Sequence, residues 1–435
     1  MKGKLRVFEA FAGVGSQSMA LRNIKCDYEV VGISDVDKYA LIAYDAIHNN
    51  NEDVEIKTKE EMLEEIKSKN IGYNFSTGKS EIPRKEDDIR KLYNAHIRNK
   101  NFGDIRLIDP NKLPEFNLFT YSFPCKNISI AGMQGGFVEG SETQSSLIWE
   151  CKKIIENKKP EYLMMENVKN IISKKHKPIL DMWCDELDKI GYINILPEKG
   201  YLNGKDFGVP QNRERVIMIS IRKDVVSNFN FPKGKDNGVR LKDILETNVD
   251  KKYYIPTDKL IIKDRTLPHN PSIGASRGRY IEKNGEKVTR QHLEINKNGI
   301  SNSLTTIQTD NLVIESKNEL IQVGVLNIKG NESNRRVYSD KGLSPTLNSM
   351  NGGNRQPKIM ETITDDTLKF KKDEIRIRKL TPKECWRLMG YSDIDFYKAQ
   401  DSGLPNSKLY ERAGRGIVVP MLEEIFKNLF IEYIN

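Results

Sequence analysis

The sequence predicts an α/β fold, with a Rossmann-like, doubly wound sheet and a smaller, irregular, β-rich second domain. Three observations support this prediction. Residues 5–50 alternate between strand, glycine turn, helix, strand and helix patterns, and the alternation resumes over residues 116–221. From about residue 224 to 374, long helical patterns stop, and short β-like stretches rich in Asn, Gly, Lys and Arg replace them.

The bulk composition permits this arrangement and limits the class of protein. The chain has 435 residues, enough for one large domain and a smaller one. Its net charge of +9 fits a polyanionic partner such as nucleic acid, although a lysine-rich solvated surface explains the charge nearly as well. No apolar run reaches the roughly 18 residues that a membrane span needs, and the N-terminus lacks a signal-peptide core. We therefore expect a cytoplasmic protein that does not enter a membrane.

The cysteines argue against a disulfide framework and against a structural metal site. There are five of them, at positions 26, 125, 151, 184 and 385, and no two form a C-x-x-C pair. Reduced thiols and no bound metal are expected. Four of the five lie in ordinary helix or strand patterns, whereas Cys125 does not.

The first strand, residues 5–11, leads into a glycine turn over residues 12–16. Such a turn at a helix N-terminus lets the backbone approach a nucleotide closely. Asp35 follows the second strand, residues 30–34, about 20 residues after the turn, which suits hydrogen bonding to ribose hydroxyls. The full G-x-G-x-x-G is absent, so the turn alone does not separate a dinucleotide site from an S-adenosylmethionine site.

Residues 51–100 interrupt the alternation. They are rich in Lys and Glu, and Met62, Ile66 and Ile71 recur at helical spacing. This pattern predicts an inserted, mostly exposed helical arm.

The alternation then resumes, and the chain ends in helices. Strands are predicted over 116–123, 162–166 and 215–221, and helices over 145–157, 179–190, 382–389 and 420–433. The predicted domains are therefore 1–223 with 375–435, carrying the insertion, and 224–374.

Polar side chains lie near the ends of three of these predicted strands. Cys125 ends the run Ser-Phe-Pro-Cys just past a strand, at the carboxyl edge where open α/β sites form. On its own, a Pro-Cys pair would more simply indicate a cysteine in a buried turn than a catalytic residue. However, Glu166 of Glu-Asn-Val should reach the same edge, and Arg213 and Arg215 of Gln-Asn-Arg-Glu-Arg bring two guanidinium groups.

These motifs resemble the cytosine-5 DNA methyltransferase family, in its prokaryotic or phage type. The resemblance covers nearly the whole chain except the insertion and the second domain. Eight motifs occur in family order: Phe-x-Gly-x-Gly at 11–15, the acid at 35, Gly-Asp-Ile at 103–105, Phe-Pro-Cys at 123–125, Glu-Asn-Val at 166–168, 211–215, 378–384 and 414–420.

The resemblance implies a DNA (cytosine-5-)-methyltransferase that acts on a cytosine flipped out of a specific duplex sequence. Cys125 matches the nucleophile that adds to carbon 6 of cytosine, and Glu166 matches the residue that holds the ring. Arg213 and Arg215 would favour the thiolate. S-adenosyl-L-methionine is the implied methyl donor, S-adenosyl-L-homocysteine the product, and no metal is implied.

The implied cofactor site draws on four motifs. Asp35 matches the ribose acid, and Asp104 matches the adenine amino contact, although a cap or turn role for Asp104 is equally expected and compatible. The full set of implied cofactor residues is Phe11, Gly13, Gly15, Asp35, Val36, Asp104, Ile105 and Pro124.

The resemblance also implies partners and leaves alternatives. Residues 224–374 would read double-stranded DNA, the glycine-rich loop 130–146 would close over it, and we expect a monomer. The sequence leaves open whether a companion restriction endonuclease exists or the enzyme belongs to a phage or a solitary methylation system. Two motifs depart from the family pattern: Lys126 replaces the usual Gln, and Arg415-Gly416 replaces Asn followed by Ser or Ala. A catalytically silent or regulatory DNA-binding relative and an RNA cytosine methyltransferase remain alternatives, and a nicotinamide-dependent oxidoreductase rests only on the glycine turn.

Overall fold

A mixed sheet holds the strands that the sequence predicts for the first domain. In the described part of the computed structural model, this seven-stranded sheet has the order β2-β1-β5-β6-β9-β7, and β8 also pairs with β9. The strands are β1 (Leu5–Ala10), β2 (Tyr28–Ser34), β5 (Leu118–Tyr121), β6 (Tyr162–Val168), β7 (Tyr192–Ile195), β8 (Leu202–Asn203) and β9 (Glu214–Arg222). β2, β1, β5 and β6 run parallel, whereas β9 runs antiparallel to β6, β7 and β8. The predicted α/β class is confirmed, with an antiparallel edge added to the expected parallel sheet.

The chain forms two compact units. Unit 1 comprises Met1–Val239, Thr346–Gly352 and Pro382–Asn435, and unit 2 comprises Arg240–Pro345 and Gly353–Thr381. The structure describes residues 3–434 except 51, 53, 75–77, 124–146, 240–242, 256–259, 262–271, 284–285, 296–311, 315–319, 321, 341, 348–349, 351–354 and 363–374. The domain boundaries expected from the sequence stay a prediction.

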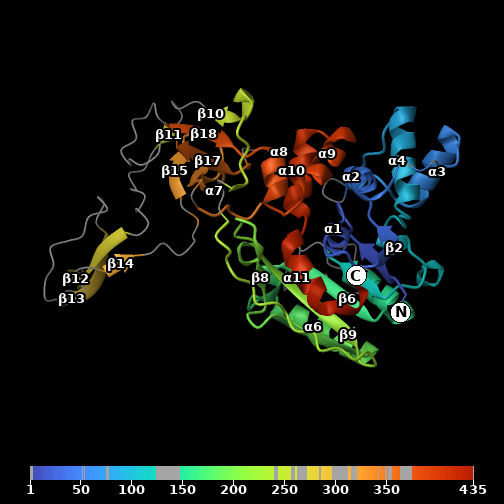
Figure 1. Ribbon diagram of the computed structural model, residues 1–435, viewed down its shortest axis with the longest axis horizontal. Helices are drawn as coiled ribbons and strands as arrows, with labels where there is room; N and C mark the ends of the chain where they lie inside the picture. Colours follow the sequence, from blue (N-terminus) through green and yellow to red (C-terminus); the bar gives the residue numbers. More distant parts are fainter. Residues whose placement is uncertain are drawn as a thin grey trace. The chain divides into compact units, whose positions relative to one another are not determined.

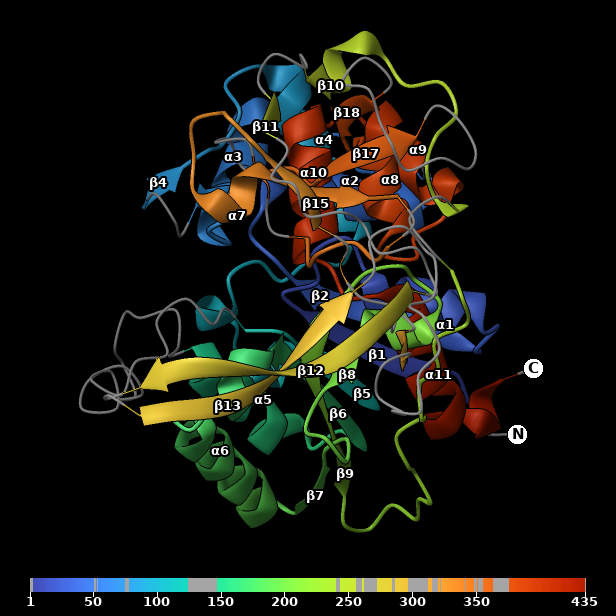
Figure 2. The same ribbon diagram turned by 90° about the vertical axis from the view of Figure 1, so that its left-hand side faces the viewer.

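Helices cover both faces of the sheet in unit 1, because successive side chains of a strand point to opposite faces. Phe8 and Ala10 of β1 pack into one apolar cluster with α5 (Leu147–Lys158) and α6 (Lys177–Ile190). Glu9, between them, faces α1 (Ser16–Asn23) on the other side, where α11 (Val419–Leu429) contacts α1. Figure 2 shows α5 and α6 on one side of these strands and α1 and α11 on the other.

The insertion is more deeply packed than the sequence predicts. Its helix α4 (Glu86–Arg98) contacts α2 (Lys38–His48), and α3 (Lys59–Ser68) contacts α4 on the side away from α2 (Figure 1). Met62, Ile66 and Ile71 are fully buried in one apolar cluster with Ile33 of β2 and Leu41 of α2. The prediction of helices is correct, but the expectation of a mostly exposed arm misses this buried face. A short hairpin, β3 (Tyr73–Asn74) and β4 (Lys79–Ser80), joins the two helices.

The C-terminal segment of unit 1 is helical, as predicted. It contains α8 (Pro382–Arg387), α9 (Asp393–Asp401), α10 (Asn406–Arg415) and α11, and α9 contacts α2. The last strand-like bridge, between Cys26 and Ile434, brings the end of the chain next to β2. Both ends of the sequence thus contribute to one unit.

Unit 2 is rich in β structure, as the sequence predicts. Its larger sheet has the order β10-β18-β17-β16-β15-β11, and a separate three-stranded sheet has the order β13-β12-β14. The strands are β10 (Tyr254–Ile255), β11 (Leu260–Ile261), β12 (Ser272–Lys283), β13 (Glu286–Ile295), β14 (Leu312–Ile314), β15 (Gln322–Leu326), β16 (Arg336–Ser339), β17 (Lys358–Thr362) and β18 (Ile375–Lys379). One short helix, α7 (Glu332–Arg335), precedes β16. The long β12–β13 pair differs from the short stretches expected here.

A carboxyl group is buried under the glycine turn of unit 1. Glu9 is fully buried, and one of its oxygens accepts a hydrogen bond from the Ser18 hydroxyl at 2.8 Å. Burial raises the pKa of Glu9 from 4.5 to about 7, and hydrogen bonds from Ser18 and Tyr44 offset part of the rise. The fold therefore favours the protonated form of this side chain.

We expect Glu9 to make the stability of unit 1 fall as the pH rises from 5 to 8. Because the folded pKa lies above the unfolded value, the stabilisation is present below pH 4.5 and is lost as the pH rises through about 7. The neutral isostere Glu9→Gln should remove roughly 2–3 kcal/mol of this pH dependence. Urea unfolding followed by tryptophan fluorescence reports on unit 1, since Trp149, Trp183 and Trp386 all lie in it. Parallel pH profiles for the two chains would contradict the prediction.

Candidate functional site

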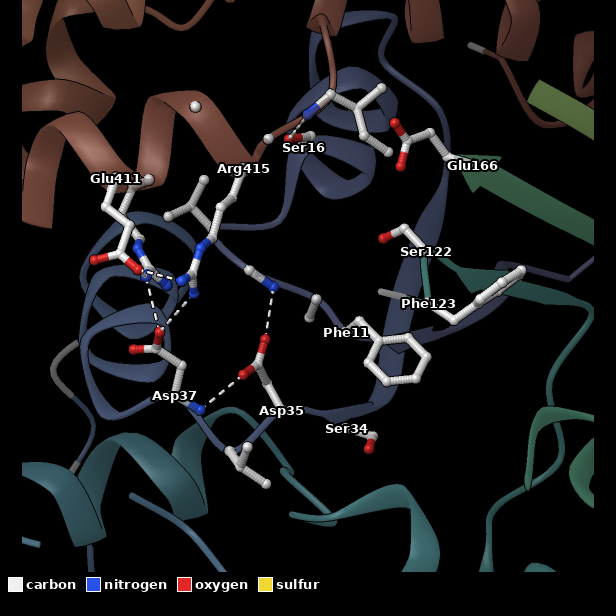
Figure 3. Close-up of a pocket in the computed structure, with 18 of the residues that line it drawn as sticks. Phe11, Ser16, Ser34, Asp35, Asp37, Ser122, Phe123, Glu166, Glu411 and Arg415 are labelled. Carbon is white, nitrogen blue, oxygen red and sulfur yellow. Dashed lines mark hydrogen bonds and ion pairs between the residues drawn. The ribbon is translucent and has the colours of Figure 1, made fainter. Parts of the chain in front are cut away.

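A cavity of about 640 Å³ opens in unit 1 at the carboxyl ends of the parallel strands. Its wall is built by the turns that follow β1, β2 and β5, by the end of β6, and by α10 with the segment after it. Figure 3 shows Phe11, Asp35, Ser122 and Glu166, from four different strand ends, around this space. Topology therefore brings together side chains that lie far apart in the sequence.

The turn after β1 has left-handed backbone at three positions. Phe11, Gly13 and Gly15 have φ values of 56°, 59° and 76°, and Phe11 and Gly13 line the cavity. Gly15 is not on the described cavity wall: a Cβ there would lie 2.4 Å from Nε2 of His48 and 2.7 Å from Tyr44. Gly15 therefore allows α1 to approach α2 closely, whereas Phe11 and Gly13 face the space where a ligand would sit.

Asp35 holds the turns after β1 and β2 together. Its carboxylate accepts hydrogen bonds from the backbone N–H groups of Gly13 at 2.9 Å and Asp37 at 2.8 Å. Burial and the nearby Asp37 raise the pKa of Asp35, while these hydrogen bonds lower it. Asp35 and Val36 both line the cavity, and the predicted ribose role of Asp35 stays a prediction.

Asp104 and Ile105 line the cavity next to the insertion. Asp104 caps a short 3-10 helix by accepting from the N–H of Arg106, and its carboxylate also accepts from the Arg106 guanidinium and from Asn70 at 2.7 Å. The capping role expected for Asp104 is therefore present. An adenine contact would have to share oxygens that already accept several hydrogen bonds.

The insertion contributes to the wall in a way that the sequence does not predict. The N–H of Gly72 donates to the carbonyl of Val36 at 2.7 Å, and Lys38 donates to the carbonyl of Glu81 at 2.6 Å. Gly72, Tyr73, Asn74 and Glu81 consequently line the cavity. Periodicity indicated helical structure in the insertion, but no local pattern marks the hairpin between α3 and α4 as part of a site.

Glu166 and Arg215 form an ion pair on the part of the cavity wall that the end of β6 and the start of β9 provide. Arg215 Nε lies 3.0 Å from the carboxylate, and both side chains are almost buried, with 12% and 13% of their surface exposed. Burial raises the pKa of Glu166, and the positive charges of Arg215 and Arg213 counter the rise. Side chains from two separate sequence motifs thus meet at the sheet edge.

Arg213 has a structural environment that differs from that of Arg215. Its guanidinium is fully buried and donates to the carbonyls of Leu347 at 2.9 Å, Gly414 at 2.9 Å and Gly416 at 2.8 Å. Burial and the neighbouring Arg215 lower the pKa of Arg213 to about 9. Arg213 therefore links three segments of unit 1, and its predicted catalytic contribution would act through Glu166.

Pro124, Cys125 and Lys126, together with the expected loop 130–146, lie outside the described residues. The preceding Phe123 lines the cavity, and its carbonyl accepts a hydrogen bond from Asn167 at 3.3 Å. The four described cysteines are not on the cavity wall, and burial raises their pKa values, to about 11 for Cys184 and about 12 for Cys26. None of these four offers a reactive thiolate to the site.

A charged cluster lines the cavity beside Asp37. We call its members the α10 cluster: Asp37, Lys408, Glu411, Arg412 and Arg415. Arg412 donates to Asp37 at 2.8 Å, Lys408 pairs with Glu411 at 2.9 Å, and Arg415 reaches both acids (Figure 3). Only Arg415 was singled out from the sequence. The spacing of 408, 411, 412 and 415 on one helix face could have indicated Lys408, Glu411 and Arg412.

The second departure in the closing motif, Gly416, has a steric cause. Ser16 Oγ lies 2.8 Å from the hydroxyl of Tyr391 and accepts a hydrogen bond from the N–H of Ile417 at 3.2 Å. A Cβ on Gly416 would lie only 1.8 Å from that tyrosine oxygen. Glycine is needed here for space, since its φ of −79° suits any residue.

We expect Gly416→Ala to lower the free energy of unfolding of unit 1 by about 2 kcal/mol, because the added methyl overpacks a buried contact. Urea unfolding followed by tryptophan fluorescence measures the change. Adding Tyr391→Phe should restore part of the loss, since it removes the closest atom. Gly3→Ala is the matched control, because a Cβ there meets nothing within 4 Å. Equal stability of the Gly416→Ala and Gly3→Ala chains would refute the steric explanation.

Two further features concern membranes and metals. Within the described ranges, no helix is both long and apolar enough to span a membrane. In that same part of the chain, no three His, Cys, Asp or Glu side chains gather in a way suited to a metal ion.

Comparison with known sequences gives a consistent result. The family model described as C-5 cytosine-specific DNA methylase matches residues 76–431. The chain is 36% identical over 432 residues to the type II methyltransferase M2.ScrFI of Lactococcus lactis subsp. cremoris, covering 98% of this chain and 99% of the relative. It is 30% identical over 488 residues to the orphan methyltransferase M.SPRI of Bacillus phage SPR, covering 100% and 99%.

Solved structures share the fold at low sequence identity. The S. pombe Dnmt2 methyltransferase aligns with a TM-score of 0.55 and 14% identity, covering 98% of this chain and 97% of the other. The Entamoeba histolytica methyltransferase EhMeth aligns with a TM-score of 0.53 and 14% identity, covering 99% of both chains. These likenesses support the α/β architecture described above.

Proposed function

This chain belongs to the C-5 cytosine-specific DNA methylases and is a DNA (cytosine-5-)-methyltransferase. We propose that it methylates carbon 5 of a flipped-out cytosine in a specific duplex sequence, and that the reaction proceeds through a covalent bond from Cys125 to the base. The observation that carries this proposal is the almost buried Glu166–Arg215 pair, which faces the same cavity as Ser122 and Phe123. Cys125 follows Phe123 by two residues.

S-adenosyl-L-methionine is the methyl donor that we propose, and when bound it supplies an electrophilic methyl group. The cavity fits such a ligand: its volume lies in the range of about 300–1,000 Å³ typical of small-molecule sites. Phe11 offers an aromatic surface, Asp35 and Asp104 offer carboxylates, and α1 begins without a side-chain cap. We propose that Phe11, Gly13, Asp35, Val36, Asp104, Ile105 and Pro124 bind the donor, and that Gly15 shapes the turn behind it.

The covalent step compensates for the weak nucleophilicity of cytosine carbon 5. We propose that the Cys125 thiolate adds to carbon 6, which moves the electron pair of the 5,6 double bond toward carbon 5 and makes that carbon nucleophilic. Transfer of the methyl group to carbon 5 would leave S-adenosyl-L-homocysteine, and carbon 5 would then lose its proton to a water molecule acting as base. The electron pair of the C5–H bond restores the double bond, the bond between sulfur and carbon 6 breaks, and the thiolate is regenerated.

Glu166 would stabilise the adduct by holding the ring nitrogen and amino group of the target base. Its position in a site with little solvent strengthens such hydrogen bonds. Arg215 fixes the orientation of the carboxylate at 3.0 Å, and Arg213 adds positive charge behind it. The same positive charges would favour the thiolate of Cys125, since a cationic environment lowers the pKa of a thiol.

The test is transfer of a tritiated methyl group from S-adenosyl-L-methionine to genomic DNA and, in parallel, to total RNA. We expect label in duplex DNA, and methylation sequencing of that DNA should show 5-methylcytosine at one recurring sequence. Label in RNA alone would support the RNA methyltransferase alternative. Binding of DNA and donor without any transfer would support the catalytically silent alternative.

The biological setting is also a proposal. We propose a cytoplasmic, monomeric enzyme that acts on double-stranded DNA beside a restriction endonuclease, by analogy with the relative named as a type II methyltransferase. Relatives named as orphan methyltransferases offer the solitary alternative. Unit 2, with its β-rich structure, would read the target sequence. DNA from cells that express the chain should resist a restriction endonuclease that cleaves at the methylated sequence.

A further inference from the structure

Arg415 lies on the cavity wall, and ion pairs with two neighbouring acids fix its orientation. Its guanidinium contacts Glu411 at 2.5 Å and Asp37 at 3.3 Å, yet 47% of the side chain remains exposed (Figure 3). These two ion pairs use two of the five N–H donors of the guanidinium. The group is therefore positioned and still able to bind a further acceptor.

The two acids in contact with Arg415 do not depend on it. Asp37 caps α2 by accepting from the N–H groups of Tyr39 and Ala40, and its other oxygen already accepts from buried Arg412 at 2.8 Å. Glu411 is also paired with Lys408 and Arg412. Arg415 is thus an additional cation whose exposed side faces the cavity.

We propose that Arg415 binds the carboxylate of the amino-acid portion of the methyl donor and so determines specificity for a donor that carries this group. The inference rests on the proposed use of S-adenosyl-L-methionine, in which this carboxylate is the one negatively charged group. The planar fork of a guanidinium matches a carboxylate with two parallel hydrogen bonds. The uncapped N-terminus of α1, which lines the same cavity, also favours negative charge.

Local charge explains why a cation is needed at this position. Without Arg415, the six acids on the described cavity wall would face five cations; the acids are Asp35, Asp37, Glu81, Asp104, Glu166 and Glu411, and the cations are Lys38, Arg213, Arg215, Lys408 and Arg412. A carboxylate entering the cavity would then meet net negative charge. With Arg415 the group is balanced, so the ligand carboxylate gains a partner and loses the repulsion.

The test is isothermal titration calorimetry on the full chain with two ligands, S-adenosyl-L-homocysteine and its decarboxylated analogue, which lacks only the carboxylate. The unaltered chain should bind the analogue about 10- to 100-fold more weakly. Arg415→Gln should weaken S-adenosyl-L-homocysteine by a similar factor and leave the analogue within about twofold. Arg415→Lys should retain part of the preference, since it keeps the charge but not the fork.

The matched control is Arg90→Gln, which removes an arginine that also forms an i,i+4 pair, with Glu86, but lies away from the cavity. It should leave both affinities unchanged. Equal weakening of both ligands by Arg415→Gln, or no weakening of S-adenosyl-L-homocysteine, would overturn the inference. The inference would also be overturned, without any variant, if the unaltered chain bound S-adenosyl-L-homocysteine less than threefold more tightly than the decarboxylated analogue. Failure of the unaltered chain to bind S-adenosyl-L-homocysteine at all would instead overturn the proposed methyl donor.

Discussion

Cys125→Ser should abolish methyl transfer, with a fall in rate on the order of 10⁴-fold or more, as for other nucleophile deletions. A serine hydroxyl stays protonated at neutral pH, whereas a few per cent of an ordinary thiol is already thiolate. The measurement is tritiated methyl transfer to duplex DNA under single-turnover conditions. Binding of S-adenosyl-L-homocysteine should be retained, because the substitution replaces one small side chain by another.

A second measurement identifies the covalent bond itself. In DNA that contains 5-fluorocytosine, the fluorine cannot leave carbon 5 as a proton does, so the bond from sulfur to carbon 6 persists. The unaltered chain should therefore form a complex with this DNA that survives denaturing electrophoresis, and Cys125→Ser should form none. Cys184→Ser is the matched control: Cys184 lies in α6 and is not on the cavity wall. A complex that persists in Cys125→Ser would disprove the assignment.

Glu166→Gln should reduce kcat/KM for methyl transfer by roughly 10²–10³-fold, the range seen when one preorganised polar group is removed from a catalytic site. Glutamine keeps the size of the side chain but cannot carry the charge that pairs with Arg215 at 3.0 Å. Glutamine also cannot take up a proton and donate it to the base. Glu166 can do so, because its raised pKa favours the protonated form of the carboxyl group.

The comparison for this variant separates chemistry from folding. Glu156→Gln, on the exposed face of α5, removes a carboxylate that pairs with Lys152 and should leave the rate unchanged. Donor binding, measured by calorimetry, should be similar in both variants. A rate for Glu166→Gln within tenfold of the unaltered chain would show that the carboxylate does not stabilise the reaction.

The sequence predicts the sheet and its polar edge because both depend on local patterns. Apolar runs bounded by glycine turns indicate parallel strands, and the carboxyl ends of such strands meet at one edge. For this reason Asp35 and Glu166 could be assigned to one site although 131 positions separate them. The family resemblance inferred from these motifs is confirmed by the family model over residues 76–431.

The remaining parts of the site depend on tertiary packing. Gly72 reaches the cavity because its N–H bonds to the carbonyl of Val36, a contact that no pattern in either segment encodes. The reason for Gly416 becomes visible only when Tyr391 is placed against Ser16. Arg213 and Arg215 look alike in sequence, yet one binds three backbone carbonyls and the other a carboxylate, because they lie at different depths.

The contact between Ser16 and Tyr391 joins positions 375 residues apart, and it affects how the protein is made. A ribosome adds roughly 5–20 residues per second, so at least about 20 s pass between synthesis of the two partners. During that interval α11 has not been made, so the surface of α1 that α11 later covers is open to chaperones and proteases. The nascent chain must therefore survive translation of all of unit 2 before α11 can cover its side of the first helix.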